Sequence, residues 1–242
     1  AGLRSITVSV DGLEEAHDWL RGRRGSHARA MEAARTCARA AGLVSDVVTC
    51  VNQRTIGELG RIKTMLVEAG VKAWRVITIF PRGRAARHPE LRLTASQFRE
   101  LMDFIVSCRA EGALRTSYDC EGFLGPYERR VRDGFAYCRA GITIASVLAD
   151  GGISACPTVR GDFVQGSIYR DSFLDVWNTR YAIMRNRQWT RTGVCTGCEV
   201  YRWCEGNGLH LRTEHSDGPM VCHWRLLHEQ GTQEGPGDPS VR

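Results

Sequence analysis

Four cysteines near the end of the 242-residue chain have the spacing of metal ligands. Cys195 and Cys198 are separated by two residues, Cys204 comes six positions later, and Cys222 follows after a loop. Two thiols so spaced can bind one metal centre from a single turn of the backbone, and four thiolates suit an iron–sulfur cluster or a tetrahedral zinc ion. The spacing therefore predicts a metal centre and leaves iron–sulfur and zinc open.

Two further cysteines, Cys138 and Cys156, flank a predicted hairpin over residues 141–155 whose turn is Asp150-Gly151-Gly152. Twelve residues separate Cys138 from Gly151, and four separate Gly151 from Cys156. This run, followed by the four-cysteine segment, resembles the SPASM domain, which is the auxiliary-cluster extension of radical S-adenosylmethionine (SAM) enzymes. The resemblance implies auxiliary 4Fe–4S clusters and makes structural zinc the lesser alternative.

The resemblance also implies how the ligands are divided. An outer cluster would take Cys195, Cys198, Cys204 and Cys222, and an inner cluster would take Cys138 and Cys156. The family usually has one more inner-cluster cysteine, and this chain has Gly208 at that position. We expect Cys120 to replace it, because nearby glycines let the backbone of this loop turn a thiolate inward. His210 and an open iron site are the alternatives.

The start of the chain carries a second resemblance. The segment Ile6-Thr-Val-Ser-Val-Asp11-Gly12, followed by His17-Asp-Trp-Leu-Arg21, is similar to the fourth barrel strand and the next loop of radical SAM/SPASM proteins. The resemblance implies that Ser9 and Arg21 contact SAM, with Asp11 a further candidate. A hydroxyl can bond the SAM ribose and a guanidinium can bind its carboxylate. Without the cysteine pattern, the favoured alternative is that Asp11-Gly12 is an ordinary turn and Arg21 a solvated helix residue.

The elements that must position these residues alternate between strand and helix. Strands are predicted over 5–10, 44–51, 73–80 and 114–117, and helices over 27–41, capped by Ser26, and over 56–69, 94–109 and 173–187. Alternation of this kind predicts parallel βαβ units. The predicted fold is α/β: the C-terminal half of a partial (β/α) barrel in residues 1–113, then a cysteine-rich, loop-rich auxiliary domain in 114–228. Residues 229–242 are predicted to be a disordered tail.

Asn52 follows the second predicted strand and is a weaker candidate for binding SAM. Its side chain could equally cap a helix or complete a turn. Barrel enzymes place their ligands at the carboxyl ends of the strands, which is where Ser9, Asp11 and Asn52 fall.

Radical SAM enzymes bind their reactive cluster through a CxxxCxxC triplet, and this sequence contains none. We expect the triplet to lie upstream of Ala1 and the chain alone to be inactive. The resemblance implies that the intact enzyme uses a 5′-deoxyadenosyl radical to abstract hydrogen from a peptide or protein. The auxiliary clusters would assist electron transfer or seat the substrate. A non-catalytic peptide-binding module, with iron–sulfur or zinc centres as staples, is the alternative.

Composition indicates the compartment in which the protein works and the kinds of partner that it can bind. The sequence has no apolar run long enough to cross a bilayer and no visible signal peptide, so clustered cysteines indicate metal binding in a reducing cytoplasm. The formal net charge of +6 is compatible with a peptide or anionic partner, whereas no aromatic-interleaved basic run suggests nucleic acid. A reductant such as flavodoxin or ferredoxin is the expected electron donor.

Overall fold

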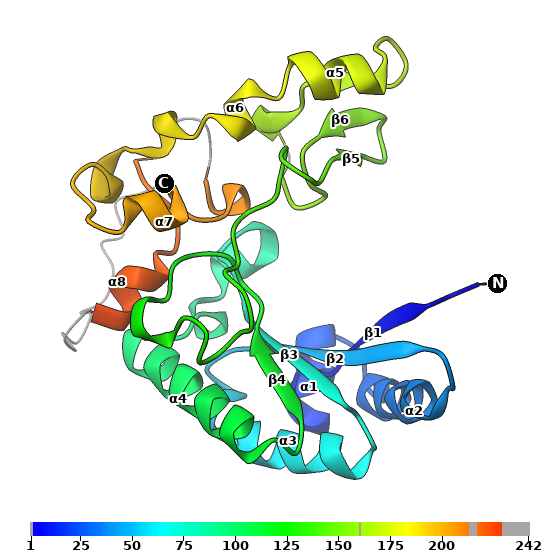
Figure 1. Cartoon of the computed structure of the whole chain (residues 1–242). Helices are drawn as coiled ribbons and strands as arrows, with labels where there is room; N and C mark the ends of the chain where they lie inside the picture. The colour runs from blue at the N-terminus through cyan, green and yellow to red at the C-terminus, as the bar shows by residue number, and fades with distance from the viewer. Residues whose placement is uncertain (1, 160, 213–216, 229–242) are drawn as a thin grey trace.

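The structure, a computed structural model, describes residues 2–159, 161–212 and 217–228 (Figure 1). The predicted tail from residue 229 lies outside the described residues. A parallel sheet has the strand order β1-β2-β3-β4, so each strand pairs with its successor in the chain. Its strands are β1 (Ser5–Ser9), β2 (Val44–Val51), β3 (Ala73–Thr78) and β4 (Arg115–Tyr118). The connecting helices are α1 (Glu14–Arg21), α2 (Ser26–Arg39), α3 (Leu59–Glu68) and α4 (Ala95–Glu111).

Alternating side chains decide which face of this sheet is buried. On β2, Val47, Thr49 and Val51 are buried, and on β3 Trp74 and Val76 are buried. The Trp74 indole N–H donates to Thr49 Oγ1 at 2.8 Å, so the polar edge of this large core side chain is satisfied. The same core takes apolar residues from α2, α3 and α4. The helices therefore cover one face of the sheet, and the other face carries the remaining strand side chains.

The ends of two helices show how local sequence sets their bounds. Helix α4 begins at a capping box, in which Thr94 and Gln97 each accept the other's backbone N–H. The prediction that Ser26 caps α2 is wrong: Ser26 is already helical, and the preceding Gly25 has a φ of 75°. The Asp18 carboxylate from α1 replaces it, accepting hydrogen bonds from Gly25 N and, at 2.8 Å, from His27 N.

The cysteine-rich region has short elements. It contains an antiparallel sheet of β5 (Ser146–Val147), β6 (Gly152–Ser154) and β7 (Gly166–Ser167). Its helices are α5 (Phe173–Thr179), α6 (Ala182–Arg185), α7 (Tyr201–Cys204) and α8 (His223–His228). The hairpin expected between Cys138 and Cys156 is present as β5 and β6. The single helix expected over 173–187 is instead two helices, because Tyr181 lies between them and its hydroxyl donates to Ser154 O at 2.8 Å.

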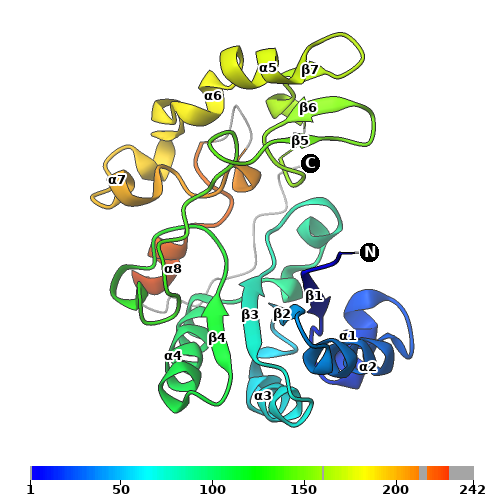
Figure 2. The same ribbon diagram turned by 45° about the vertical axis from the view of Figure 1, so that its right-hand side comes forward.

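Two apolar cores hold the described chain together. The first lies under the parallel sheet and the second includes Cys138, Ile153, Val176 and Met184. Helix α8 returns to the first core, where Leu226 and Leu227 pack, and it lies beside α4. Strands β3 and β4 point with their carboxyl ends toward the cysteine-rich region (Figure 2).

The predicted domain boundary at residues 113 and 114 stays a prediction. Leu124 and Val131 follow that boundary in sequence, yet they pack in the first core. The predicted α/β class is confirmed, with a four-stranded parallel sheet preceding a small antiparallel one. Among the described helices, none has the length and apolar character that crossing a membrane requires.

Candidate functional site

The four cysteines of the predicted outer cluster line one cavity. Cys195 ends a short 3-10 helix, Cys204 ends α7, and Cys222 directly precedes α8. These three and Cys198 line a cavity of about 30 Å³. Other residues that line it include Phe123, Tyr201, Asn207, His223 and Trp224. Within the part of the chain that the structure describes, no three His, Cys, Asp or Glu side chains are arranged to hold a single metal ion.

N–H groups near three of these sulfurs favour the thiolate form. The backbone N–H groups of Gly206 and Asn207 act to lower the pKa of Cys204, and the backbone N–H of Arg225 acts to lower the pKa of Cys222. The Arg212 guanidinium donates to Cys195 Sγ at 3.1 Å. N–H donors stabilise thiolate ligands and tune the cluster that they bind. The donor set therefore fits an iron–sulfur cluster held by these cysteines.

The backbone makes an unusual turn directly after Cys204. Glu205, Gly206 and Asn207 have φ values of 44°, 84° and 73°, all in the left-handed region. A Cβ at Gly206 would lie 2.5 Å from Thr190 Oγ1 and 2.8 Å from Arg212 Nη2, so a larger residue does not fit. Glycine is therefore needed here both for backbone conformation and for the close approach of Arg212.

Burial and charge oppose each other at these thiols. Burial raises the pKa of Cys195, Cys204 and Cys222, and the neighbouring cysteines raise it further. The hydrogen-bond donors lower the pKa, as does the Arg212 charge near Cys195. A bound metal centre would displace the thiol protons and leave the sulfurs as thiolates despite their burial. Metal binding and folding are therefore coupled at this site.

Cys138 and Cys156 come together in the second core. Cys138 is buried, and Cys156 packs against the same cluster. The thiol of Cys156 also lies 3.3 Å from Thr158 Oγ1. The hairpin of β5 and β6 links the two cysteines, as the sequence predicts.

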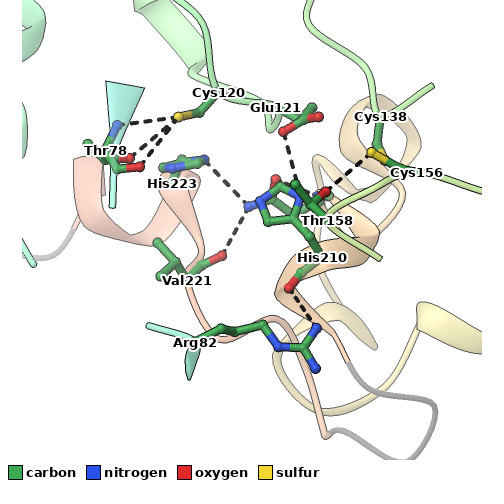
Figure 3. Close-up of polar contacts among 12 residues, drawn as sticks. Thr78, Arg82, Cys120, Glu121, Cys138, Cys156, Thr158, His210, Val221 and His223 are labelled. Carbon is green, nitrogen blue, oxygen red and sulfur yellow. Dashed lines mark hydrogen bonds and ion pairs between the residues drawn. The ribbon is translucent and has the colours of Figure 1, made fainter. Parts of the chain in front are cut away.

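Cys120 lies with the parallel sheet instead. Its Sγ accepts a hydrogen bond from Thr78 N at 3.4 Å, and its side chain packs against the first core. Figure 3 shows Cys120 beside Thr78 on one side of the view and Cys138 with Cys156 on the other. The structure does not group Cys120 with these two cysteines, and its role as an inner-cluster ligand stays a prediction.

The position of the absent family cysteine is filled by another side chain. A Cβ at Gly208 would lie 2.6 Å from Cε1 of His210 and 2.8 Å from its Nδ1. His210 Nδ1 is 3.9 Å from Glu121 Oε2 (Figure 3). The His210 ring centroid is 4.7 Å from that of Phe80. Burial lowers the pKa of His210, which favours the neutral imidazole that binds metals. His210 thus occupies the space where a side chain at residue 208 would begin.

Two candidate SAM contacts meet at the carboxyl end of β1. Asp11 is fully buried, and its Oδ2 accepts a hydrogen bond from Arg21 Nε at 2.5 Å. Its Oδ1 accepts from Cys50 N at 2.9 Å, which ties the carboxylate to β2. The Arg21 side chain is 41% exposed. The pair therefore anchors a guanidinium at the strand end while leaving part of it accessible.

The other two candidates have different surroundings. Ser9 is half-buried at the end of β1 and pairs with Val48, on the opposite side of the strand from Val8. The Asn52 side chain accepts a hydrogen bond from Arg54 N at 2.9 Å, and its backbone N–H donates to Thr55 Oγ1. Asn52 thus completes a local turn, which is the alternative that the sequence left open. SAM binding by both residues stays a prediction.

Sequence reasoning missed an ion-pair network on the open face of the sheet. The Arg75 guanidinium bonds Asp46 Oδ2 on β2, Asp119 Oδ2 at 2.9 Å after β4, and Thr7 Oγ1 at 2.7 Å on β1. The hydrogen bond to Asp46 raises the pKa of Arg75 further. The sequence signal that could have indicated this network is the presence of charged residues within otherwise apolar strands. Arg212 was also missed, since nothing in its local sequence indicates burial.

Comparison with known proteins shows which family model and which proteins this chain is similar to. The model of the SPASM family, described as an iron–sulfur cluster-binding domain, matches residues 138–199. The AdoMet-dependent heme synthase of Nitratidesulfovibrio vulgaris is 22% identical over 93% of this chain and 66% of its own length. The antilisterial bacteriocin subtilosin biosynthesis protein AlbA of Bacillus subtilis is 25% identical over 90% of this chain and 48% of its own length.

Two solved structures share the fold. Native anSMEcpe with bound AdoMet and Cp18Cys peptide has a TM-score of 0.62 and 16% identity, covering 93% of this chain and 65% of that one. SuiB of Streptococcus suis bound to S-adenosylmethionine has a TM-score of 0.63 and 16% identity, covering 93% of this chain and 54% of that one. The chain spans 48% to 66% of the length of these four proteins. Residues 138–199 thus match the SPASM family, and the chain as a whole is similar to radical SAM/SPASM proteins in its parallel sheet and six-cysteine pattern.

Proposed function

We propose that this chain works in a radical SAM enzyme that modifies a peptide or protein, with auxiliary 4Fe–4S clusters in its cysteine-rich region. When bound, SAM and its reducing cluster supply a 5′-deoxyadenosyl radical that abstracts hydrogen from the substrate. The observation that carries the proposal is the cavity lined by Cys195, Cys198, Cys204 and Cys222, in which the Arg212 guanidinium donates to Cys195 Sγ.

The strand ends would orient SAM. Arg21 would bind the SAM carboxylate and Ser9 the ribose, with Asn52 a weaker contact. Asp11 would act by holding the Arg21 guanidinium, because it is buried and bonded to it. The carboxyl ends of β3 and β4 face the cysteine-rich region, so SAM bound at this edge of the sheet would lie on the side of the proposed auxiliary centres (Figure 2).

The inner cluster would be bound by Cys138 and Cys156 with one further protein ligand. Cys120 remains the ligand proposed from sequence. The space at Gly208 favours His210 over Cys120, because the imidazole lies where the family cysteine would start. Loss of iron in His210→Ala but not in Cys120→Ala would assign the ligand to His210, and the opposite result would assign it to Cys120.

The substrate class is proposed from the molecules that similar proteins bind. SuiB has been solved bound to the precursor peptide SuiA, and anSMEcpe with a peptide. We therefore propose a peptide or protein substrate and a reductant such as flavodoxin or ferredoxin. A second candidate is a heme-related substrate, because three curated relatives are named AdoMet-dependent heme synthases. Binding assays with a cysteine-containing peptide and with an iron porphyrin would separate the two.

Metal analysis of anaerobically purified protein tests the proposal. We expect a brown protein that contains iron and acid-labile sulfide, and we expect SAM to bind more weakly after Arg21→Ala than after Arg24→Ala. A colourless protein with stoichiometric zinc and no iron would refute the clusters and favour a zinc-stabilised module. Iron binding without any SAM binding would favour the non-catalytic peptide-binding module.

A further inference from the structure

Arg212 is a cation without a carboxylate partner among the described residues. It is fully buried, directly after the 3-10 helix Leu209–Leu211. Its Nε donates to Gly206 O at 2.7 Å and its Nη2 donates to Cys195 Sγ at 3.1 Å. Its Nη1 is buried and has no hydrogen-bond acceptor in the described part of the chain. The guanidinium is thus aimed at the outer four-cysteine site.

A buried guanidinium needs a counter-ion. Removing a cation from water costs several kcal/mol unless an opposite charge and hydrogen bonds compensate. Among the described ion pairs, none involves Arg212. The group in contact with Arg212 that can become an anion is the Cys195 thiol, which belongs to the outer site. The site and Arg212 therefore stabilise each other only when the cysteines are ionised, as they are when they bind a cluster.

We infer that Arg212 is a positioning residue that fixes Cys195 and raises the reduction potential of the outer cluster. The inference rests on the proposed cluster at Cys195, Cys198, Cys204 and Cys222. Reduction adds one negative charge to a centre bound by four thiolates. A buried positive charge and an N–H donor on a ligand sulfur stabilise this added charge, so they favour the reduced state.

The contact differs from that of Arg187, which is another buried arginine of the cysteine-rich region. Arg187 donates through Nη2 to Cys138 O at 3.0 Å, which is a backbone carbonyl and not a sulfur. Its Nε donates to Met184 O at 2.9 Å. Arg187 therefore supports the backbone, whereas Arg212 reaches a ligand atom. The space for Arg212 exists because Gly206 has no side chain.

The test compares three variants of the full chain, loaded with iron under anaerobic conditions. Arg212→Met removes the charge and the donor, and Arg212→Lys keeps the charge without the forked geometry. Arg202→Met is the matched control, because Arg202 is exposed and lies two residues before Cys204. The midpoint potential of the outer cluster is measured by redox titration followed by electron paramagnetic resonance, with iron and sulfide content determined for each sample.

We expect Arg212→Met to lower the ratio of reduced to oxidised cluster at a fixed potential at least tenfold, which is about 59 mV for a one-electron couple. Arg212→Lys should recover part of this shift, and Arg202→Met should cause a much smaller one. Equal iron content with a midpoint in Arg212→Met that matches Arg202→Met would overturn the inference.

A measurement on the unsubstituted protein covers the case in which Arg212→Met fails to fold. Arginine carrying ¹⁵N in its guanidinium group is incorporated, and the reduced cluster is examined for hyperfine coupling to that nitrogen. Coupling to one guanidinium is expected, and its absence in an iron-loaded sample refutes the contact. Failure of the unsubstituted chain to bind iron would refute the proposed cluster itself, and the inference with it.

Discussion

Arg21→Ala is the substitution whose consequences follow most directly from the geometry. Asp11 is fully buried, and its charge is balanced by Arg21 with help from Cys50 N. Removing one partner of a fully buried ion pair typically costs about 3–5 kcal/mol. The Arg21 side chain is 41% exposed, so water screens the pair and the cost is smaller. We expect the free energy of unfolding to fall by about 1–3 kcal/mol, as for a charged hydrogen bond.

A double-mutant cycle separates the charge from the packing. Asp11→Asn removes the carboxylate charge with little change in shape, so Arg21→Ala should cost less in that background. The expected coupling is about 1–2 kcal/mol, within the range for residues in direct contact. Thermal or urea unfolding of the four proteins, each loaded identically with metal, measures it. Arg24→Ala is the control for loss of an exposed arginine nearby.

The same substitution should weaken SAM binding by about 10- to 100-fold, because about 1.4 kcal/mol corresponds to a factor of ten. Arg21→Lys should recover part of the affinity, since a lysine keeps the charge but cannot bind a carboxylate with two parallel donors. Additive effects of Arg21→Ala and Asp11→Asn would show that the buried carboxylate does not depend on Arg21. Unchanged SAM affinity in Arg21→Ala would remove Arg21 from the proposed SAM site.

Other predictions concern the metal and the pH dependence of stability. Cys204→Ser should lose iron of the outer cluster and destabilise the cysteine-rich region, whereas Cys37→Ser in α2 should keep full iron content; equal iron in both would contradict the ligand assignment. The 242-residue chain should form no 5′-deoxyadenosine from SAM after reduction, measured against a no-protein control, because its sequence has no CxxxCxxC triplet. Burial lowers the pKa of His17 below 6.5, so its contribution to the free energy of unfolding is complete above about pH 6.5 and is lost as the pH falls below it. The charged and titratable groups facing His17 are Asp11, Asp18, Arg21 and His27. His17→Gln should flatten this pH dependence in unfolding measurements, and an unchanged slope would assign it to another group.

Much of the parallel sheet could be predicted because its strands and helices follow local rules. The apolar run Val44–Val51 forms β2 with the predicted bounds, and Thr94 and Gln97 mark the start of α4. Even where the predicted helix over 173–187 divides, apolar residues from both parts, Val176, Tyr181 and Met184, are buried together. Periodicity identifies the face that must be buried, but it does not show where a tertiary contact interrupts the helix.

The sequence by itself determined the composition of the candidate site: which cysteines could bind a cluster, and that Ser9 and Asp11 lie at a strand end with Arg21 in the segment that follows. Ligand spacing is readable because a metal centre needs its thiols within a few residues or across a short loop. Only the tertiary structure decided that Cys120 packs with Thr78 and that His210 fills the space at Gly208.

Arg212 is the clearest example of a contact that only the tertiary structure decides. Its guanidinium reaches Cys195, seventeen positions earlier, because the left-handed turn at Glu205, Gly206 and Asn207 brings the backbone close. Such contacts depend on distances across the folded chain, which residue types and spacing do not encode. Sequence therefore identified the groups that could bind the cluster, and the fold decided which charges and donors surround them.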